Sequence, residues 1–272
     1  MKYVAKTIKI ILAVFIGLLI IFPFYWILIS SLKTPDTILI PDLWPKAVTL
    51  DHYKELINET IYLSALRSSI VIAVGTMLLV VILVVLAGYA LYRFEFRGRD
   101  FFQKLILVTY VFPGILLVVP VYSIMSSLHL IDNPLGLIIM NVTFSAPFCV
   151  WLMRGFFTSI PYTLDESAAL DGAGKLRIMF SIIFPLIRPG IATVAIYSFI
   201  QSWGEFTFSS ILLTSDLHKT LPIALNAIMG QYTVRWGQMS ASAVLTILPV
   251  IILFAFFGKY FVSGLTEGAV KG

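Results

Sequence analysis

A chain of 272 residues that is 59% hydrophobic and only 12% charged carries too few charged side chains to cover a water-soluble surface. Its mean hydropathy of +0.97 indicates that most of its exterior faces hydrocarbon. The formal net charge of +5 does not indicate nucleic-acid binding, because the basic side chains do not gather with aromatic ones on a polar domain. The composition therefore excludes a soluble domain and favours an all-α, polytopic membrane protein.

Six long apolar segments predict six membrane-spanning helices, because about 20 apolar residues cross the hydrocarbon core of a bilayer. They cover residues 10–32, 68–92, 105–128, 133–153, 187–215 and 236–258. Five carry no charge, whereas the segment 187–215 opens on Arg188 and contains Glu205. We interpret the first segment as a retained helix, since it is longer than a typical signal-peptide core. Residues 1–272 are expected to form a single membrane domain.

Two local patterns refine this outline. Between the first two spans, residues 51–57 mix polar and apolar side chains and predict a short surface helix. In the third span, Pro113, Gly114 and Pro120 predict a kinked helix. Such a kink suits a gate, but it is equally an ordinary packing feature.

The distribution of basic residues predicts the orientation of the chain, because cytoplasmic loops carry an excess of Lys and Arg. With the N-terminus in the cytoplasm, 13 of the 19 basic residues fall in inside segments. The strongest signal is the cluster of Arg93, Arg97, Arg99 and Lys104. Both termini and the long connection between the fourth and fifth spans are therefore expected in the cytoplasm.

That connection, residues 158–185, contains a short predicted helix. Thr163 and Glu166 have the spacing of a capping box, Pro161 precedes them, and Gly172 suits the end of a helix. A helix of about two turns is too short to cross a membrane. Its small side chains leave the backbone open to another surface; they are Ser167, Ala168, Ala169 and Ala173. The helix is either a docking site for a partner or a capped connector without one.

The same connection resembles the EAA loop of ABC importer permeases. The residues that carry the resemblance are Glu166-Ser167-Ala168, Asp171-Gly172-Ala173, Phe180, Ile183, Pro185-Leu186 and Pro189. The rest of the chain is similar to the carbohydrate branch, and most to the smaller permease of maltose-type transporters. Ser167 departs from the family, which usually has Ala there, but both side chains are small.

The resemblance implies a permease subunit of an ATP-driven sugar or oligosaccharide importer in the cytoplasmic (inner) membrane of a bacterium or archaeon. The implied partners are a second, larger permease, two ATP-binding subunits and an extracytoplasmic solute-binding protein. In the family, the loop helix sits in a cleft on an ATP-binding subunit. The residues implied to dock there are Glu166, Ser167, Ala168, Ala169, Asp171, Gly172 and Ala173.

The chain lacks the sequence of an ATP site of its own. It contains no G-x-x-x-x-G-K-[ST] phosphate loop, since Gly174-Lys175 is followed by Leu176. ATP and Mg are therefore expected in the partner subunits, and this chain is expected to bind no cofactor and to catalyse no reaction. Cys149, the single cysteine, and three scattered histidines give no pattern of a metal site.

Candidate cargo contacts lie on the fourth and fifth spans. Tyr197, Gln201 and Glu205 recur at i, i+4 and i+8 and predict a polar stripe, and nearby Trp203 is suited to stacking on a sugar. A carboxylate within a span is costly, so Glu205 should face a cavity or a partner. Asn141 gives a similar case on the fourth span. Hydrogen bonding between helices explains the same pattern, and we favour that explanation slightly.

Three alternatives stay open. The chain is an ABC permease for a non-sugar solute, a secondary transporter or channel that works alone, or a membrane-embedded enzyme. A secondary transporter usually has ionisable residues deep in several spans, and here only Glu205 qualifies. An enzyme needs convergent catalytic groups, and the chain has neither G-x-S-x-G nor H-E-x-x-H.

Overall fold

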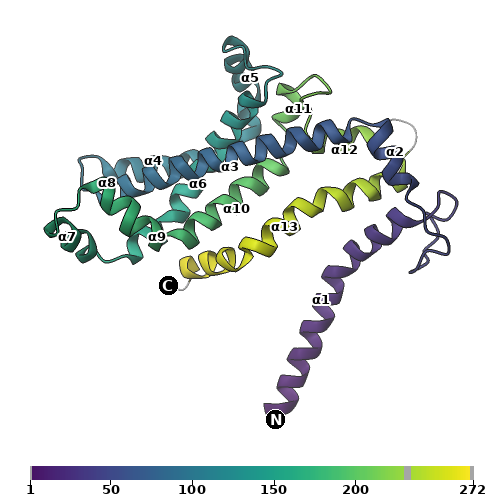
Figure 1. Ribbon diagram of the computed structural model, residues 1–272, viewed down its shortest axis with the longest axis horizontal. Helices are drawn as coiled ribbons and strands as arrows, with labels where there is room; N and C mark the ends of the chain where they lie inside the picture. The colour runs from purple at the N-terminus through teal and green to yellow at the C-terminus, as the bar shows by residue number, and fades with distance from the viewer. Residues whose placement is uncertain (1, 230–233, 270–272) are drawn as a thin grey trace. The chain divides into compact units, whose positions relative to one another are not determined.

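The computed structural model describes residues 2–229 and 234–269, and the regular elements of this part are helices (Figure 1). The prediction of an all-α chain is confirmed. The α-helices are α1 (Lys2–Leu32), α2 (Asp51–Glu59), α3 (Tyr62–Arg93), α4 (Arg99–Val111), α5 (Val118–Ser127), α6 (Pro134–Ser159), α7 (Thr163–Leu170), α8 (Lys175–Ile178), α9 (Phe184–Leu186), α10 (Arg188–Trp203), α11 (Ser209–Leu212), α12 (Leu221–Ile228) and α13 (Trp236–Ala269). A 3-10 turn, η1 (Gly114–Leu117), precedes α5, and a π-helical turn, η2 (Met179–Ile183), precedes α9.

Four helices are long and apolar enough to cross a membrane: α3, α6, most of α1 and the first 25 residues of α13. Two further candidates are bent pairs, α4 with η1 and α5, and α8 to α9 with α10. The described part therefore holds four spans, or six if each bent pair is one span. This is the polytopic architecture that the sequence predicted.

The third and fifth predicted spans are not straight helices. At Phe112 and Pro113 the chain bends by 89° between α4 and the following helical segment, as the kink prediction required. In the fifth segment, α10 ends at Trp203, well short of residue 215. The helix stops there because the Glu205 carboxylate accepts hydrogen bonds from the backbone N–H groups of Phe208 and Ser209, which start α11 instead.

The chain divides into two compact units. One comprises Met1–Leu63 and Ala224–Pro249, and the other comprises Ser64–Ile223 and Val250–Gly272, as far as these residues are described. In the first unit, the predicted surface helix is present as α2, whose buried His52 lies against Gly237. Lys33 is also buried there and donates a hydrogen bond to the Ile40 carbonyl.

In the second unit, α3, α6 and α10 pack closely through glycines. Gly88 of α3 lies against the ring of Phe157 in α6, and Gly190 of α10 lies against Met153 and Phe156 of α6. Small residues let helix backbones approach one another where no hydrophobic effect drives them together. These contacts build a core that also includes Cys149 and Ala168.

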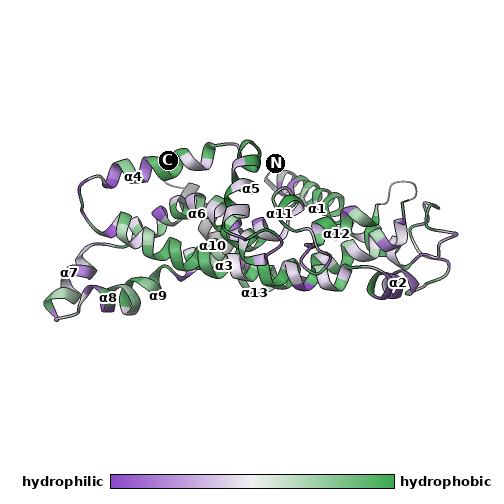
Figure 2. Ribbon diagram, turned by 90° about the horizontal axis from the view of Figure 1, so that it is seen from above, coloured by the Kyte–Doolittle hydropathy of each residue, from purple (hydrophilic) through white to green (hydrophobic). Residues whose placement is uncertain are grey.

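The outward surfaces of the long helices are apolar. Large exposed hydrophobic side chains follow one another along α1, and hydrophobic residues dominate α3 and α13, whereas α2 is hydrophilic (Figure 2). An exposed apolar surface of this extent would be unstable in water but is stable against lipid or another membrane subunit.

Candidate functional site

Two features of the second unit stand out as candidate sites: the loop that carries α7 and a cavity between helices. The short helix predicted after Pro161 is present as α7, Thr163–Leu170, about two turns long (Figure 1). Its start differs from the prediction. Tyr162 is already in the helical conformation and its carbonyl accepts from the N–H of Asp165 and Glu166. Thr163 therefore lies inside the helix, no side chain caps this end, and the predicted capping box is wrong.

The end of α7 agrees with the prediction. Gly172 has φ of +80°, in the left-handed region that favours glycine. The N–H of Ala173 bonds to the carbonyl of Ala168, and the N–H of Gly172 bonds to that of Ala169. This pair of bonds is the Schellman motif, which satisfies two carbonyls that a helix end otherwise leaves free.

Among the predicted docking residues, five are exposed and two are not. Glu166, Ser167, Ala169, Asp171 and Gly172 are exposed, as is the neighbouring Leu170 at 90%. Ala168 is buried in the core of the second unit, and Ala173 is half-buried against it. The exposed residues form the outward surface of α7, while Ala168 packs α7 against the core of the second unit.

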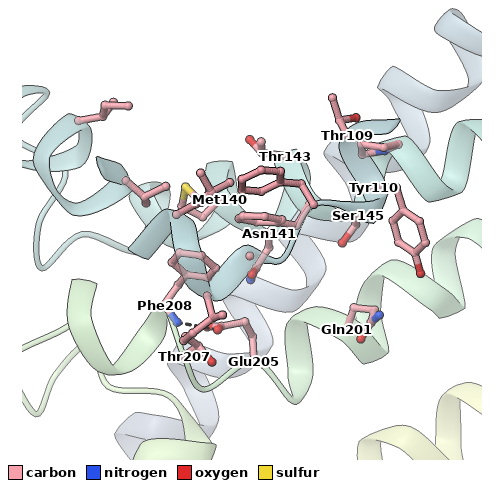
Figure 3. Close-up of a pocket in the computed structure, with 18 of the residues that line it drawn as sticks. Thr109, Tyr110, Met140, Asn141, Thr143, Ser145, Gln201, Glu205, Thr207 and Phe208 are labelled. Carbon is pink, nitrogen blue, oxygen red and sulfur yellow. Dashed lines mark hydrogen bonds between the residues drawn. The ribbon is translucent and has the colours of Figure 1, made fainter. Parts of the chain in front are cut away.

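A cavity of about 890 Å³ lies between α4, η1, α5, α6 and α10 (Figure 3). Its aromatic lining includes Tyr110, Phe144, Tyr197 and Phe208. Phe144 and Phe208 stack with their ring centroids 5.1 Å apart. The uncharged polar side chains that line it are Thr109, Asn141, Thr143, Ser145, Gln201 and Thr207. Aromatic faces together with amide and hydroxyl groups can bind a polar, uncharged molecule.

The structure brings four of the five predicted cargo residues to this cavity: Tyr197, Gln201, Glu205 and Asn141. Gln201 donates a hydrogen bond of 2.8 Å to the Tyr197 hydroxyl, so the two side chains form the predicted stripe. Trp203 does not line the cavity. It is 7% exposed and stacks on Phe199 with ring centroids 5.4 Å apart.

Hydrogen bonds within the protein occupy two of the predicted cargo residues. The Asn141 amide donates to the Ser202 hydroxyl at 2.8 Å, and this hydroxyl donates to Thr76 at 3.3 Å. This buried chain links α6, α10 and α3, so the interhelical alternative is confirmed for Asn141. Both oxygens of Glu205 accept backbone N–H groups, from Phe208 at 2.7 Å (Figure 3) and from Ser209 at 2.8 Å.

Beside α11, Asp132 ties the turn between α5 and α6 to the segment that follows α11. Burial acts to raise the pKa of its carboxyl. Hydrogen bonds from the N–H and hydroxyl of Ser215 and the N–H of Thr214 outweigh burial and lower this pKa to about 2. The Nδ1 of His218 lies 3.4 Å from the same carboxylate. Asp132 therefore stays ionised and holds this turn at neutral pH.

Sequence reasoning missed two groups of residues. The aromatic side chains that line the cavity come from segments far apart in the chain, and a single sequence carries no signal that joins them. Arg93 was counted only as part of a basic cluster, but the structure buries it between α3, α6 and α7. Its place directly after a predicted span, residues 68–92, was the available signal. In the described residues, no group of three His, Cys, Asp or Glu side chains is placed to hold a metal ion.

The comparison that decides the family covers most of the second unit. Residues 84–267 match the family described as binding-protein-dependent transport system inner membrane component. The chain belongs to this family. The resemblance to ABC importer permeases is thereby confirmed, and this permease is a multi-pass membrane protein and a component of a transport system.

Several curated relatives match this permease over nearly its whole length. The inner membrane ABC transporter permease protein YcjP of Escherichia coli is 38% identical, over 96% of this chain and 94% of that protein. The arabinooligosaccharides transport system permease protein AraQ of Bacillus subtilis is 34% identical, over 94% and 92%. The trehalose/maltose transport system permease protein MalG of Thermococcus litoralis is 32% identical, over 98% and 97%.

Two solved structures share the fold of this permease. A bacterial ABC transporter involved in the import of the acidic polysaccharide alginate matches with a TM-score of 0.82 and 24% identity, over 95% of this chain and 97% of that one. A bacterial alginate ABC transporter in complex with its pentasaccharide-bound periplasmic protein matches with a TM-score of 0.71 and 15% identity, over 94% and 93%.

Proposed function

We propose that this permease forms part of the translocation path of an ATP-driven sugar or oligosaccharide importer. The observation that carries the proposal is the full-length similarity to permeases whose names specify arabinooligosaccharides, trehalose and maltose as cargo. The cavity supports it, because its aromatic and amide groups suit a sugar, which has apolar ring faces and many hydroxyl groups.

The cargo that fits this cavity is an uncharged saccharide. Among the described residues that line it, none is Lys, Arg or His, and the one acidic residue is Glu205. An anionic sugar would lose its hydration here without gaining a cationic partner, which disfavours its passage. A sugar without charge meets no such penalty.

We propose that movement of the ATP-binding subunits is transmitted to this permease through α7. An exposed two-turn helix that is packed against its own protein through Ala168 can bind in a cleft of an ATP-binding subunit. In this proposal Glu166, Ser167, Ala169, Asp171 and Gly172 contact that subunit, and residues 158–185 lie in the cytoplasm. ATP and Mg bind to the two ATP-binding subunits, and this chain binds no cofactor.

The remaining partners complete the path. A second permease supplies the other half of the cavity wall, and an extracytoplasmic solute-binding protein delivers the sugar. The family description, which specifies binding-protein-dependent transport, supports the second of these partners. In this proposal both termini of the chain lie in the cytoplasm of a bacterial or archaeal cell.

Uptake and copurification together test the proposal. Cells that lack this permease should fail to accumulate labelled uncharged oligosaccharides and should regain uptake when the gene is restored. The tagged chain should copurify with an ATPase. Glu166→Ala and Gly172→Ala should weaken that association, whereas Asp100→Asn, a change at an exposed carboxylate of another connection, should not.

Two results would contradict the proposal. Uptake of uronic acid oligomers in preference to uncharged ones would exclude the proposed cargo. Purification without any ATPase, under conditions that preserve the second permease, would exclude coupling through α7 and favour a transporter that works alone.

A further inference from the structure

Arg93, the last residue of α3, is the most enclosed charged side chain among the described side chains of the second unit. Its side chain is 1% exposed. Its guanidinium donates to the carbonyl of Ile160 at 2.7 Å and to those of Phe157 and Pro161 at 3.4 Å. These carbonyls lie at the end of α6, where a helix leaves acceptors free and favours a cation. Arg93 therefore caps the C-terminal end of α6.

The same guanidinium reaches α7. It pairs with the carboxylate of Asp165 in the first turn of that helix. The ring of Tyr162 covers it, with the guanidinium carbon 4.4 Å from the ring centroid, and the Tyr162 hydroxyl donates to the Tyr92 carbonyl at 2.6 Å. One planar group thus joins α3, α6 and α7 in a single geometry.

The end of α3 also contacts the start of α8, the helix that follows α7 in the chain. The Tyr89 hydroxyl donates to the carbonyl of Lys175 at 3.4 Å, and the Lys175 ammonium lies 4.9 Å from the centre of the Phe94 ring. Along the chain, by contrast, α7 continues toward α10 through Gly172 and Gly174, which are exposed and have no side chain to pack against a neighbouring helix. The stiff connection of α7 therefore runs to α3, which is not its neighbour in sequence.

Orientation in the membrane does not require this burial. Arg97 and Lys104, from the same basic cluster, are exposed, and exposed charges suffice to keep a loop in the cytoplasm. Removing Arg93 from water is costly unless several acceptors surround it. Three carbonyls, one carboxylate and one aromatic ring surround its guanidinium, so Arg93 connects the three helices mechanically.

We propose that the Arg93–Asp165 pair is the positioning joint through which movement of α7 reaches the end of α3 and the end of α6, the helix that lines the cavity. The inference rests on the proposed docking of α7 to an ATP-binding subunit. A displacement of α7 moves the ends of α3 and α6 together, because the Arg93 guanidinium is bonded to Asp165 of α7 and to the Ile160 carbonyl at the end of α6. Neither residue belongs to the surface that contacts the ATPase.

The test uses the complete importer in proteoliposomes, with Asp165→Asn and Arg93→Lys as variants. Three quantities are measured: copurified ATPase, the rate of ATP hydrolysis and the sugar transported per ATP. We expect both variants to retain the ATPase and hydrolysis within about twofold, and to transport at least about fivefold less sugar per ATP. Lysine keeps the charge of Arg93 but lacks its planar fork, so it should not rescue coupling.

Asp100→Asn is the matched control, because it removes an exposed carboxylate near another arginine, Arg99, and should leave transport per ATP unchanged. Asp165→Asn keeps the shape of the side chain and decides the question if Arg93→Lys fails to accumulate. Unchanged transport per ATP in Asp165→Asn would overturn the inference. Loss of the ATPase from this variant would also overturn it, since the pair would then act in docking. Absence of the ATPase from the wild-type complex would instead overturn the proposed function.

Discussion

Glu205 illustrates how one residue can be read in two ways. A carboxylate within a span is costly, which marked it as a functional candidate. In the structure it lines the cavity, but both of its oxygens accept backbone N–H groups of Phe208 and Ser209. Its first task is therefore to end α10 and to start α11. If Glu205 also contacts cargo, it does so with a carboxylate that these two backbone N–H groups already hold in position.

Replacement of Glu205 separates these tasks. Glu205→Ala leaves two backbone N–H groups without their acceptor, and each such group costs about 1–3 kcal/mol when it is buried. Glu205→Gln keeps one acceptor oxygen and should lose less. Thermal unfolding of the purified permease should rank wild type above Gln and Gln above Ala. Full stability of Glu205→Ala with abolished transport would identify a cargo contact instead.

Asp132 gives a prediction for the dependence of stability on pH. Its folded pKa of about 2 lies below the ordinary value of about 3.9 for Asp. The ionised group therefore stabilises the fold fully above the ordinary value, and this contribution disappears as the pH falls toward 2. We expect Asp132→Asn to unfold at a lower temperature than wild type at neutral pH. The difference should shrink below about pH 4, and a constant difference would contradict this explanation.

At the scale of elements, the helix contacts of the second unit depend on glycine. A methyl group at Gly190 would lie 2.6 Å from the Phe156 ring and 2.9 Å from the Met153 sulfur, so α10 and α6 would have to separate. Gly155, on the same α6 helix, has open space at that position. These two glycines form a matched pair.

We expect Gly190→Ala to destabilise the permease by about 1–3 kcal/mol, the usual cost of overpacking. Gly155→Ala should be neutral or slightly stabilising, because alanine is the better helix former. Chemical or thermal unfolding in the same detergent measures both. Equal effects of the two substitutions would show that α6 and α10 do not pack as described.

The element α7 shows where local reasoning succeeds. Its length and its end at Gly172 depend on nearby residues and were predicted. Its start was not, because Tyr162 enters the helix early and its side chain contacts Tyr92 and Arg93 of α3. A contact over about seventy residues overrode the capping preference of Thr163.

For the whole molecule, the orientation in the membrane yields a direct prediction. Leu39 and Leu176 are 77% and 71% exposed, and the native Cys149 is fully buried, so single cysteines at the two leucines can be labelled selectively. In intact cells a membrane-impermeant maleimide should label Leu39→Cys but not Leu176→Cys. Opened cells should label both. Labelling of Leu176→Cys from outside would contradict the orientation and the proposed docking of α7.

The sequence by itself determined that the chain lies in a membrane, that it is all-α, roughly where its spans lie, and that a short helix ends at Gly172. These follow from composition, segment length and local backbone preferences, which need no distant contact. Only the tertiary structure decided that α10 stops at Trp203, that Trp203 is buried and that Asn141 bonds to Ser202. It alone gathered the aromatic wall of the cavity and closed Arg93 between three helices. The bonds of Asn141 to Ser202 and of Arg93 to Ile160 join residues 61 and 67 positions apart, and periodicity along one chain carries no information about such contacts.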